Sequence, residues 1–574
     1  MNLGELRAAG WARDLDVELV RRLEGAFGRP GGEDGDVRVL LALAGAATGG
    51  GDVCLPLEAR ALETTLRRRA GEEGLEGLED VLRAAGAGTR KLGESGFAGP
   101  AAAGRPFVVE QDRLYLRRYW RYEEETAAAL LALAEGGAED AAGADISPED
   151  EARLNGEQKA ALRGALAARV TVITGGPGTG KTFVAARLLD ILMRRGGTKV
   201  VAAAPTGKAA ARLKESLAKA SGGQGAGRLE AKTVDRLLEW RPGPYFRHDA
   251  DNPLREDVVV VDETSMLDLP KAAKLLRALG KRARLVLLGD EHQLSSVNPG
   301  NVMAEICASE RLAGRVKRLT ESRRFQAGTD VQLLAAAVLA GEREEAWARL
   351  TGGSDVQWHD GGGLDAGKNR VFGAHMEEGY RNFALAVAAW KAAGAAKKDA
   401  KVPAVLAAMG DYRVLCVTRH GPQGTEALNL AAADRLFPGR GKAAEYDGRV
   451  VMILKNTRDI GLYNGDVGVV LGGKAWFAAE GGPKAVPVFL LPEHETAFAM
   501  TVHKSQGSEF ESVTVVLPEK GFEALLRREL VYTAITRTKK RVDVWCTRAA
   551  FAAAVAAATE RHTGLRAKLD RPPR

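Results

Sequence analysis

The sequence has no apolar run long enough to cross a membrane and no regular spacing of metal-binding residues. A membrane span needs about 18–20 apolar residues, and the longest candidate, Ala127 to Ala134, is much shorter. The four cysteines are scattered without a CxxC pair, and the eight histidines form no HExxH or HxxxH pattern. These absences argue against a membrane protein, a disulfide framework, a zinc ribbon and an iron–sulfur cluster.

Charge of one sign is not in large excess either. Lys and Arg number 82 against 75 Asp and Glu, a formal net charge of +7 over 574 residues. Such a balance permits a nucleic-acid partner but does not demonstrate one. The first residues are charged and lack an apolar core, so we expect no signal peptide and a cytoplasmic protein. The length exceeds what one hydrophobic core supports, and about three or four units are expected.

The composition and the pattern of expected strands and helices change along the chain, which predicts three parts. Residues 1–145 carry helical runs and end in a connector rich in Gly, Ala, Glu and Asp. Residues 146–335 and 336–574 alternate short Val-rich strands with helices, the pattern of parallel α/β architecture. Within the last part, residues 446–492 indicate a small inserted β-barrel. The expected strands are Val170–Thr174, Val200–Ala204, Val258–Val261, Arg284–Leu288, Arg413–Thr418, Val450–Leu454, Val467–Leu471, Val486–Leu490, Ser512–Leu517 and Val542–Trp545.

A phosphate-binding loop is the strongest signal in the chain. The segment from Gly175 to Thr182 is GGPGTGKT and lies between an expected strand and an expected helix. Glycines at this place let backbone N–H groups approach an anion at the helix N-terminus. We expect ATP or GTP here, with Lys181 on the β- and γ-phosphates and Thr182 on Mg²⁺. The other loop residues expected to bind the nucleotide are Gly176, Pro177, Gly178, Thr179 and Gly180.

Two carboxylates, Asp262 and Glu263, directly follow a strand of four valines. Asp262 suits the metal through its bound water, and Glu263 suits the general base for hydrolysis. The plainer alternative is that this pair only caps the next helix. Phosphoryl transfer needs both a held metal and an oriented water, so the phosphate loop favours the catalytic interpretation.

Several segments on the nucleotide side resemble the motifs of superfamily 1 helicases. The segment GDEHQ, ending at Gln293, resembles motif III, and the segments around Arg324 and Arg537 resemble motifs IV and VI. The resemblance implies that Gln293 senses the γ-phosphate and that the two arginines neutralise charge in the transition state. It also assigns Gln158 to adenine and Glu509, in the motif V segment, to nucleotide binding, and it favours ATP.

Two further segments resemble the helicase motifs that carry single-stranded DNA. They are APTGKAA at 204–210, which is similar to motif Ia, and TVHKSQGSEF at 501–510, which is similar to motif V. Each fragment alone has a plainer explanation, but their order along the chain is that of a helicase. The resemblance implies DNA contacts by Pro205, Thr206, Lys208, Thr501, His503 and Ser505.

The chain resembles the RecD family, the α subunit of exodeoxyribonuclease V, more closely than helicases in general. The segments RHDADNPL at 247–254, HETAFAM at 494–500, DVCLPL at 52–57 and DRLYL at 112–116 carry this resemblance. It implies two RecA-like P-loop domains, a mainly helical N-terminal domain that docks a partner, and an SH3-like barrel at 446–492. It also implies a 5′→3′ motor on single-stranded DNA at duplex ends, with RecB- and RecC-type partners, in the repair of double-strand breaks.

Some alternatives stay open at this point. The Asn464-Gly465 pair in the insertion predicts either a plain hairpin turn or a DNA contact of the SH3-like unit. The chain could be a free-standing RecD-like helicase or a scaffold that binds ATP without hydrolysing it, although intact motif residues argue against the scaffold. No cluster with nuclease spacing follows Asp411-Tyr412, so we expect any nuclease activity in a partner subunit.

Overall fold

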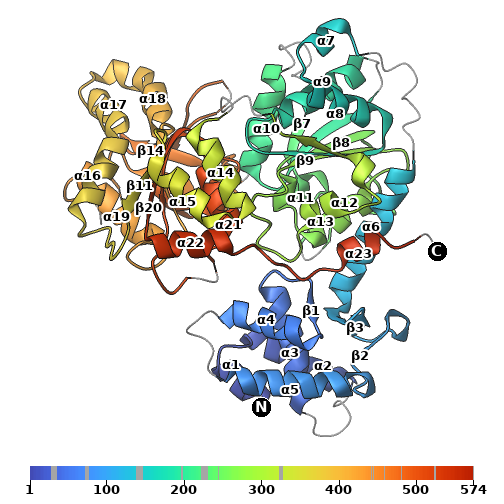
Figure 1. Cartoon of the computed structure of the whole chain (residues 1–574). Helices are drawn as coiled ribbons and strands as arrows, with labels where there is room; N and C mark the ends of the chain where they lie inside the picture. The colour runs from blue at the N-terminus through green and yellow to red at the C-terminus, as the bar shows by residue number, and fades with distance from the viewer. Residues whose placement is uncertain are drawn as a thin grey trace.

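The computed structural model describes residues 1–27, 35–70, 77–136, 146–194, 198–220, 230–242, 245–321, 328–440, 443, 445–457, 459–479, 481–522 and 525–572. Within these residues the chain forms an N-terminal unit, two α/β units and a small β-sheet inserted into the second (Figure 1). Across the described part of the chain, none of the helices combines the length and the apolar character that a membrane crossing requires.

The N-terminal unit is mainly helical, as the sequence predicts. Helix α3 is its centre, because Leu40, Leu41 and Leu43 are fully buried among the surrounding helices. A small sheet of order β1-β4-β3-β2 closes one side. The elements are α1 (Leu3–Ala8), α2 (Asp14–Phe27), α3 (Gly35–Gly49), β1 (Cys54–Pro56), α4 (Ala59–Ala70), α5 (Leu78–Lys91), β2 (Ala98–Gly99), β3 (Phe107–Glu110) and β4 (Arg113–Leu116).

The first α/β unit is a six-stranded parallel sheet of order β10-β5-β9-β8-β6-β7 with helices on both faces. The four strands expected from the sequence are confirmed, while β7 and β10 were not predicted. The carboxyl ends of β5, β6, β8 and β9 meet at one edge, where open α/β sheets bind ligands. The elements are α7 (Pro148–Ala152), α8 (Gly156–Ala167), β5 (Val170–Gly175), α9 (Lys181–Arg194), β6 (Val200–Ala204), α10 (Gly207–Ala220), β7 (Glu230–Thr233), α11 (Val234–Leu237), β8 (Val258–Val261), α12 (Leu269–Ala278), β9 (Arg284–Gly289), α13 (Val302–Ala308) and β10 (Val316–Leu319).

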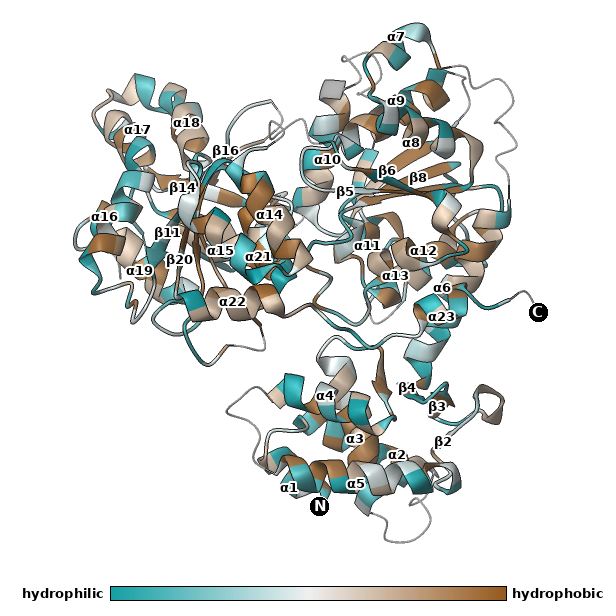
Figure 2. Ribbon diagram, viewed as in Figure 1, coloured by the Kyte–Doolittle hydropathy of each residue, from teal (hydrophilic) through white to brown (hydrophobic). Residues whose placement is uncertain are grey.

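The second α/β unit is a five-stranded parallel sheet of order β11-β20-β19-β12-β18. The inner strand β12 is buried along its whole length, as expected for a sheet covered on both faces, whereas the edge strand β11 carries several polar residues; Figure 2 shows brown and teal stretches in this unit. Its hydrophobic core includes Val331 of α14. The elements are α14 (Asp330–Ala340), α15 (Arg343–Gly352), β11 (Val356–Asp360), α16 (Arg370–Gly379), α17 (Arg381–Lys391), α18 (Ala395–Met409), β12 (Tyr412–Cys416), α19 (Thr425–Leu436), β18 (Ala499–Thr501), α20 (Val502–Ser505), β19 (Phe510–Val516), α21 (Arg528–Ile535), β20 (Thr538–Cys546) and α22 (Arg548–Ala556).

The insertion is an antiparallel sheet of order β16-β15-β14-β13-β17. Alternate residues of β13 face opposite ways: Val451 and Ile453 line the insertion's own core, whereas Val450 and Met452 pack on the second α/β unit. The strand expected at 486–490 is wrong in its second half, because β16 ends at Pro487 and 488–490 form a 3₁₀ turn. The SH3-like fold of the insertion stays a prediction. The strands are β13 (Val450–Ile453), β14 (Val467–Leu471), β15 (Lys474–Phe477), β16 (Lys484–Pro487) and β17 (His494–Thr496).

Helix α6 (Arg117–Glu135) links the N-terminal unit to the first α/β unit and packs along α12 (Figure 1). The last residues of the chain return to the same place. We call residues 557–572 the C-terminal strap; it leaves α22, crosses below the first α/β unit and ends in α23 (Leu565–Leu569) beside α6. On the way, Arg561 donates to the carbonyls of Asn298 and Gly300, and the His562 N–H donates to Asp52.

A buried ion cluster fastens the strap. Lys568 is only 4% exposed, and its ammonium contacts Glu110, Glu123 at 3.8 Å and Glu124 at 3.1 Å. Glu123 is fully buried, and burial raises its pKa although Lys568 opposes this shift. The strap therefore joins the end of the second α/β unit to the N-terminal unit and α6 through an ion cluster whose central pair, Lys568 and Glu123, is buried.

We predict that Lys568→Ala destabilises the chain by about 3–5 kcal/mol, because it leaves Glu123 buried without its cation. Thermal or urea unfolding measures this loss. A raised carboxyl pKa costs stability only while the group is ionised, so the deficit should shrink as the pH falls. The control is Lys539→Ala, which removes an exposed pair with Glu511 and should change stability by less than about 1 kcal/mol. Wild-type unfolding of Lys568→Ala would contradict the assignment.

Candidate functional site

The phosphate-binding loop has the geometry that its sequence predicts. Strand β5 ends at Gly175, and α9 begins at Lys181. Gly178 and Gly180 have φ values of +80° and +89°, in the left-handed region that favours glycine. The loop thereby turns back on itself at the N-terminus of α9, where helix amides attract anions.

In this structure the Lys181 ammonium folds back onto the loop. It donates to the carbonyls of Gly175 at 2.6 Å and Gly176 at 3.0 Å. The buried Thr179 hydroxyl also donates to Gly176, at 2.9 Å. A phosphate in the loop would compete with these carbonyls for the ammonium, since a charged acceptor binds it more strongly.

The acidic pair lies at the tip of β8, beside the loop. Burial, and then the neighbouring Glu263 carboxylate, raise the pKa of Asp262 to about 6. The Glu263 backbone N–H donates to Asp262 at 2.8 Å, and Glu263 has a φ of +52°, which non-glycine residues rarely adopt. A cation beside Asp262 would relieve both causes of its raised pKa. The carboxylate and the nearby Thr182 hydroxyl are oxygen donors of the kind that Mg²⁺ prefers.

Gln158 holds the loop from behind and is fully buried. Its amide donates to the Thr179 carbonyl at 3.0 Å, and its oxygen accepts from the Asn155 N–H in the capping box of α8. A Cβ on Gly180 would lie 2.4 Å from the Gln158 amide nitrogen. Contact with adenine would need Gln158 to exchange these bonds, so its adenine role stays a prediction.

Both α/β units line the nucleotide pocket, a cavity of about 300 Å³. Arg537 and Glu509 reach it from the second unit, and Arg212 on α10 crosses the cleft to the Gly507 carbonyl and pairs with Glu509 at 3.3 Å. Arg537 is buried, and its guanidinium donates to the carbonyls of Thr533 at 3.0 Å and Ser508 at 3.4 Å. Of the sequence-predicted residues, the pocket brings together Pro177, Gly178, Gly180, Lys181, Thr182, Asp262, Glu263, Gln293, Glu509 and Arg537. Arg324 lies outside the described residues.

The segment after β9 joins the two units. The Asp290 carboxylate accepts from Gln293 at 3.1 Å and from the buried Tyr532 hydroxyl of α21 at 2.8 Å. Leu294 enters the hydrophobic core of the second unit. The Leu294 N–H donates to the Thr533 hydroxyl at 3.0 Å, and its carbonyl accepts from Gln506 at 2.9 Å. Tyr532 thus belongs to the packed interface rather than to a base-stacking surface.

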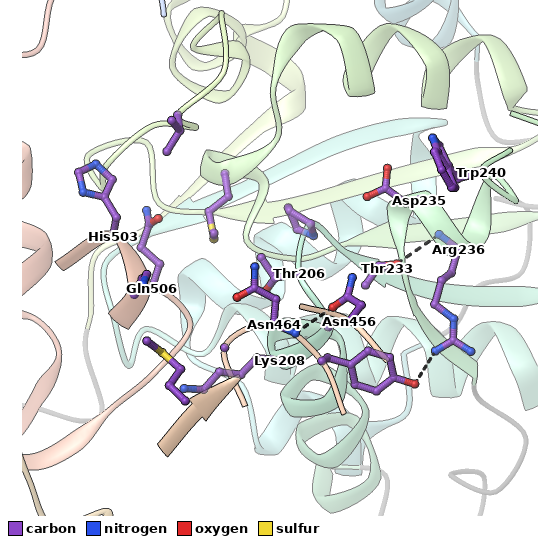
Figure 3. Close-up of a pocket in the computed structure, with 18 of the residues that line it drawn as sticks. Thr206, Lys208, Thr233, Asp235, Arg236, Trp240, Asn456, Asn464, His503 and Gln506 are labelled. Atoms are coloured by element: carbon purple, nitrogen blue, oxygen red, sulfur yellow. Dashed lines mark hydrogen bonds between the residues drawn. The ribbon is translucent and has the colours of Figure 1, made fainter. Parts of the chain in front are cut away.

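A second cavity, of about 930 Å³, runs past the ends of β6 and β8 toward the insertion (Figure 3). We call it the groove. Its wall contains hydroxyls, amides and cations from both α/β units and from the insertion. The lining residues used below are Pro205, Thr206, Lys208, Thr233, Asp235, Arg236, Trp240, Val297, Asn456, Asn464, Gly465, His503 and Gln506.

The groove contains four of the six residues predicted to touch DNA, namely Pro205, Thr206, Lys208 and His503. The other two do not line it. Thr501 caps α20 by accepting from the Lys504 N–H at 3.3 Å. Ser505 is fully buried and donates to the Val502 carbonyl, so the predicted direct contact of its side chain is not available in this structure.

One lysine and one histidine of the groove have lowered pKa values. Burial, and then the cations Arg413 and Arg212, lower the pKa of Lys208 to about 8, against the opposite effect of Asp466. Burial, and then Arg561, lower the pKa of His503. Both groups therefore hold their protons less firmly than they would in water.

Sequence reasoning missed the part of the groove wall around Thr233, Arg236 and Trp240, where no motif was expected. The Asn464-Gly465 pair forms a tight turn, and its contact with DNA stays a prediction. Gly465 has a φ of +91°, as a tight turn requires, and both residues also line the groove. The nearby Tyr463 hydroxyl accepts from Arg236 at 3.1 Å, which ties the insertion to α11.

Comparisons with known proteins agree with this geometry. Residues 8–115 match the profile of the RecBCD enzyme subunit RecD, N-terminal domain. RecBCD enzyme subunit RecD of Mycobacterium tuberculosis H37Rv is 35% identical over 597 residues, which cover 99% of this chain and 97% of that protein. The chain belongs to the RecD family. RecBCD enzyme subunit RecD of Mycolicibacterium smegmatis is 36% identical, and the aligned region covers 96% of this chain and 97% of that protein.

The other matches concern the two α/β units. Residues 153–361 match the profile of an AAA domain, and residues 496–544 match the UvrD-like helicase C-terminal domain. Among solved structures, one on DNA unwinding at forked duplex DNA by two coordinating Pif1 helicases covers 69% of this chain and 94% of its own. Its sequence identity is 17%, and its TM-score is 0.39. With its family membership, the chain is a helicase of the RecD type.

Proposed function

We propose that the chain is an ATP-driven DNA helicase that moves 5′→3′ along single-stranded DNA. The observation that carries this proposal is that two short segments line both cavities. Gln293 lines the nucleotide pocket and Val297 the groove, while Gln506 lines the groove and Gly507 the pocket. Any change of the pocket on ATP binding or hydrolysis therefore reaches the groove within a few residues.

We assign the nucleotide chemistry to residues of the pocket. Lys181 leaves the loop carbonyls and pairs with the β- and γ-phosphates, and Glu263 takes the proton of the attacking water. Arg537 and Arg324 neutralise charge on the transferring phosphoryl group, with Gln293 at the γ-phosphate. Thr182 and Asp262 would hold Mg²⁺, which would supply positive charge to neutralise the phosphates.

We assign the groove to single-stranded DNA. Thr206, Lys208 and His503 line the groove, which supports this assignment because phosphate contacts need only well-placed donors and cations. DNA is also consistent with the family, because a relative with 31% identity over 83% of this chain is the ATP-dependent RecD2 DNA helicase of Deinococcus radiodurans.

The proposed setting is a RecBCD-type helicase–nuclease, with RecB- and RecC-type subunits, that processes double-strand breaks in the cytoplasm. The RecBCD subunits RecD of Mycobacterium tuberculosis and Mycolicibacterium smegmatis are covered over 97% of their length. Only 60% of the Deinococcus helicase is covered, which favours a subunit over a free-standing helicase. The N-terminal unit is the proposed partner-docking part. Deleting residues 1–110 would also remove Asp52 and Glu110, which hold the strap, so point substitutions on its surface are the cleaner test.

Substitution of the pocket residues tests the catalytic assignment. We predict that Glu263→Gln keeps ATP binding but lowers DNA-stimulated ATP turnover by about 10²–10⁴-fold, because the water loses its base. Lys181→Ala should lose turnover and weaken nucleotide binding as well. A fluorescent ATP analogue and a phosphate-release assay separate the two effects. Unchanged turnover in Lys181→Ala would refute the assignment, and binding without any turnover in the wild type would favour the scaffold alternative.

The lowered pKa of Lys208 gives a pH prediction. A lysine that binds phosphate must be protonated, so single-stranded DNA affinity should fall as the pH rises through about 8. Between pH 7 and 9 the loss should reach up to about tenfold, because one unit above the pKa only about a tenth of the lysine is charged. Fluorescence anisotropy with a labelled oligonucleotide measures this. Lys208→Arg keeps its charge and should show a flatter profile; identical profiles would exclude Lys208 from phosphate binding.

A further inference from the structure

The groove ends at a half-exposed tryptophan. Trp240 lines the groove with 50% of its surface exposed, and Figure 3 shows it at the opposite end from His503. The known motifs of the sequence do not include it, and the nucleotide chemistry does not use it. Its place at the groove therefore needs its own explanation.

The backbone around Trp240 is built to hold the indole in this position. Helix α11 is capped by Thr233, whose hydroxyl accepts from the Arg236 N–H at 3.2 Å. The chain then turns at Glu239, which has a φ of +54°. The Trp240 N–H donates to the Asp235 carbonyl at 2.9 Å. A left-handed non-glycine residue costs free energy, so such a turn persists only where the surroundings fix it.

The returning strand anchors the turn to the first α/β unit. Phe246 forms a β-bridge with Trp240, packs against the hydrophobic core and has the Lys274 ammonium 4.9 Å from its ring centroid. The Arg247 N–H donates to the carbonyls of Leu238 and Glu239, both at 3.1 Å. The half-buried Phe246 ring thus anchors this segment to the core, while the Trp240 ring lines the groove.

Other residues of the groove offer polar groups and positive charge that suit the backbone of a nucleic acid. Thr206, Asn456 and Asn464 offer hydroxyls and amides, and Lys208 and Arg236 offer positive charge. Tyr463 also lines the groove, but its ring packs against the Arg236 guanidinium, whose Cζ lies 5.8 Å from the ring centroid, and Trp240 brings the larger π-face. Aromatic faces bind unpaired bases by stacking, with little preference for sequence, whereas bases inside a duplex are already stacked.

We propose that Trp240 is a stacking subsite for one unpaired base of the strand in the groove. This inference rests on the proposed function, namely that the groove takes single-stranded DNA. The subsite fixes the register of the strand at one end of the groove, and it distinguishes single strands from duplexes without reading sequence.

An abasic-site scan tests the subsite. Anisotropy is measured with a labelled oligothymidylate and with copies in which one abasic nucleotide is moved stepwise along the strand. The wild type should lose about 5- to 100-fold in affinity at one position of the scan. Trp240→Ala should lose a similar factor on the intact strand and give a flat scan. Trp240→Phe, which keeps a π-face, should retain most of the affinity.

The same hairpin supplies a matched control. Tyr245 is 67% exposed and is not among the residues that line the groove, so Tyr245→Ala should bind as the wild type does. Wild-type affinity of Trp240→Ala, or a flat scan with the wild-type protein, would overturn the subsite, and the flat scan would do so even if the variant failed to fold. Failure of the wild type to bind any single strand would instead refute the proposed function.

Discussion

The burial of Leu294 in the hydrophobic core of the second α/β unit is the contact on which the site depends. Its backbone is bound as well, by the Thr533 hydroxyl and the Gln506 amide. One residue earlier, Gln293 lines the nucleotide pocket, and Gln506 lines the groove. A residue held on all sides cannot shift alone. Relative motion of the two α/β units would therefore displace the nucleotide pocket and the groove together. In the proposed mechanism, this coupling converts ATP turnover into movement along a strand.

The parts of the site that follow directly from chain connectivity could be predicted from the sequence. Parallel strands deliver their carboxyl ends to one edge, so the loop after β5, Asp262 after β8 and Gln293 after β9 had to meet. The sequence pattern of these strands also made them recognisable, because they are short Val- and Leu-rich runs bounded by turn residues. Strand β7 escaped prediction because Glu230–Thr233 has no apolar run and owes its place to pairing with β6.

Features that depend on packing between distant segments could not be predicted. Ser505 is buried because α20 packs within the second α/β unit. A serine in the sequence gives no sign of such burial. Lys568 looks like a surface lysine in the sequence, yet three glutamates enclose it. His359, His375 and Asp543 also meet from three elements, although the histidines show no spacing pattern; Arg541 binds both oxygens of that carboxylate. Only the folded chain reveals such neighbours.

Strand displacement by the purified chain tests the central claim most directly. Duplexes with a 5′ or a 3′ single-stranded tail are compared in the presence of ATP and Mg²⁺, with Lys181→Ala as the blank. A 5′→3′ motor driven through the shared segments should separate only the 5′-tailed duplex, and only with ATP. Separation of the 3′-tailed duplex alone, or separation that survives in Lys181→Ala, would contradict the account.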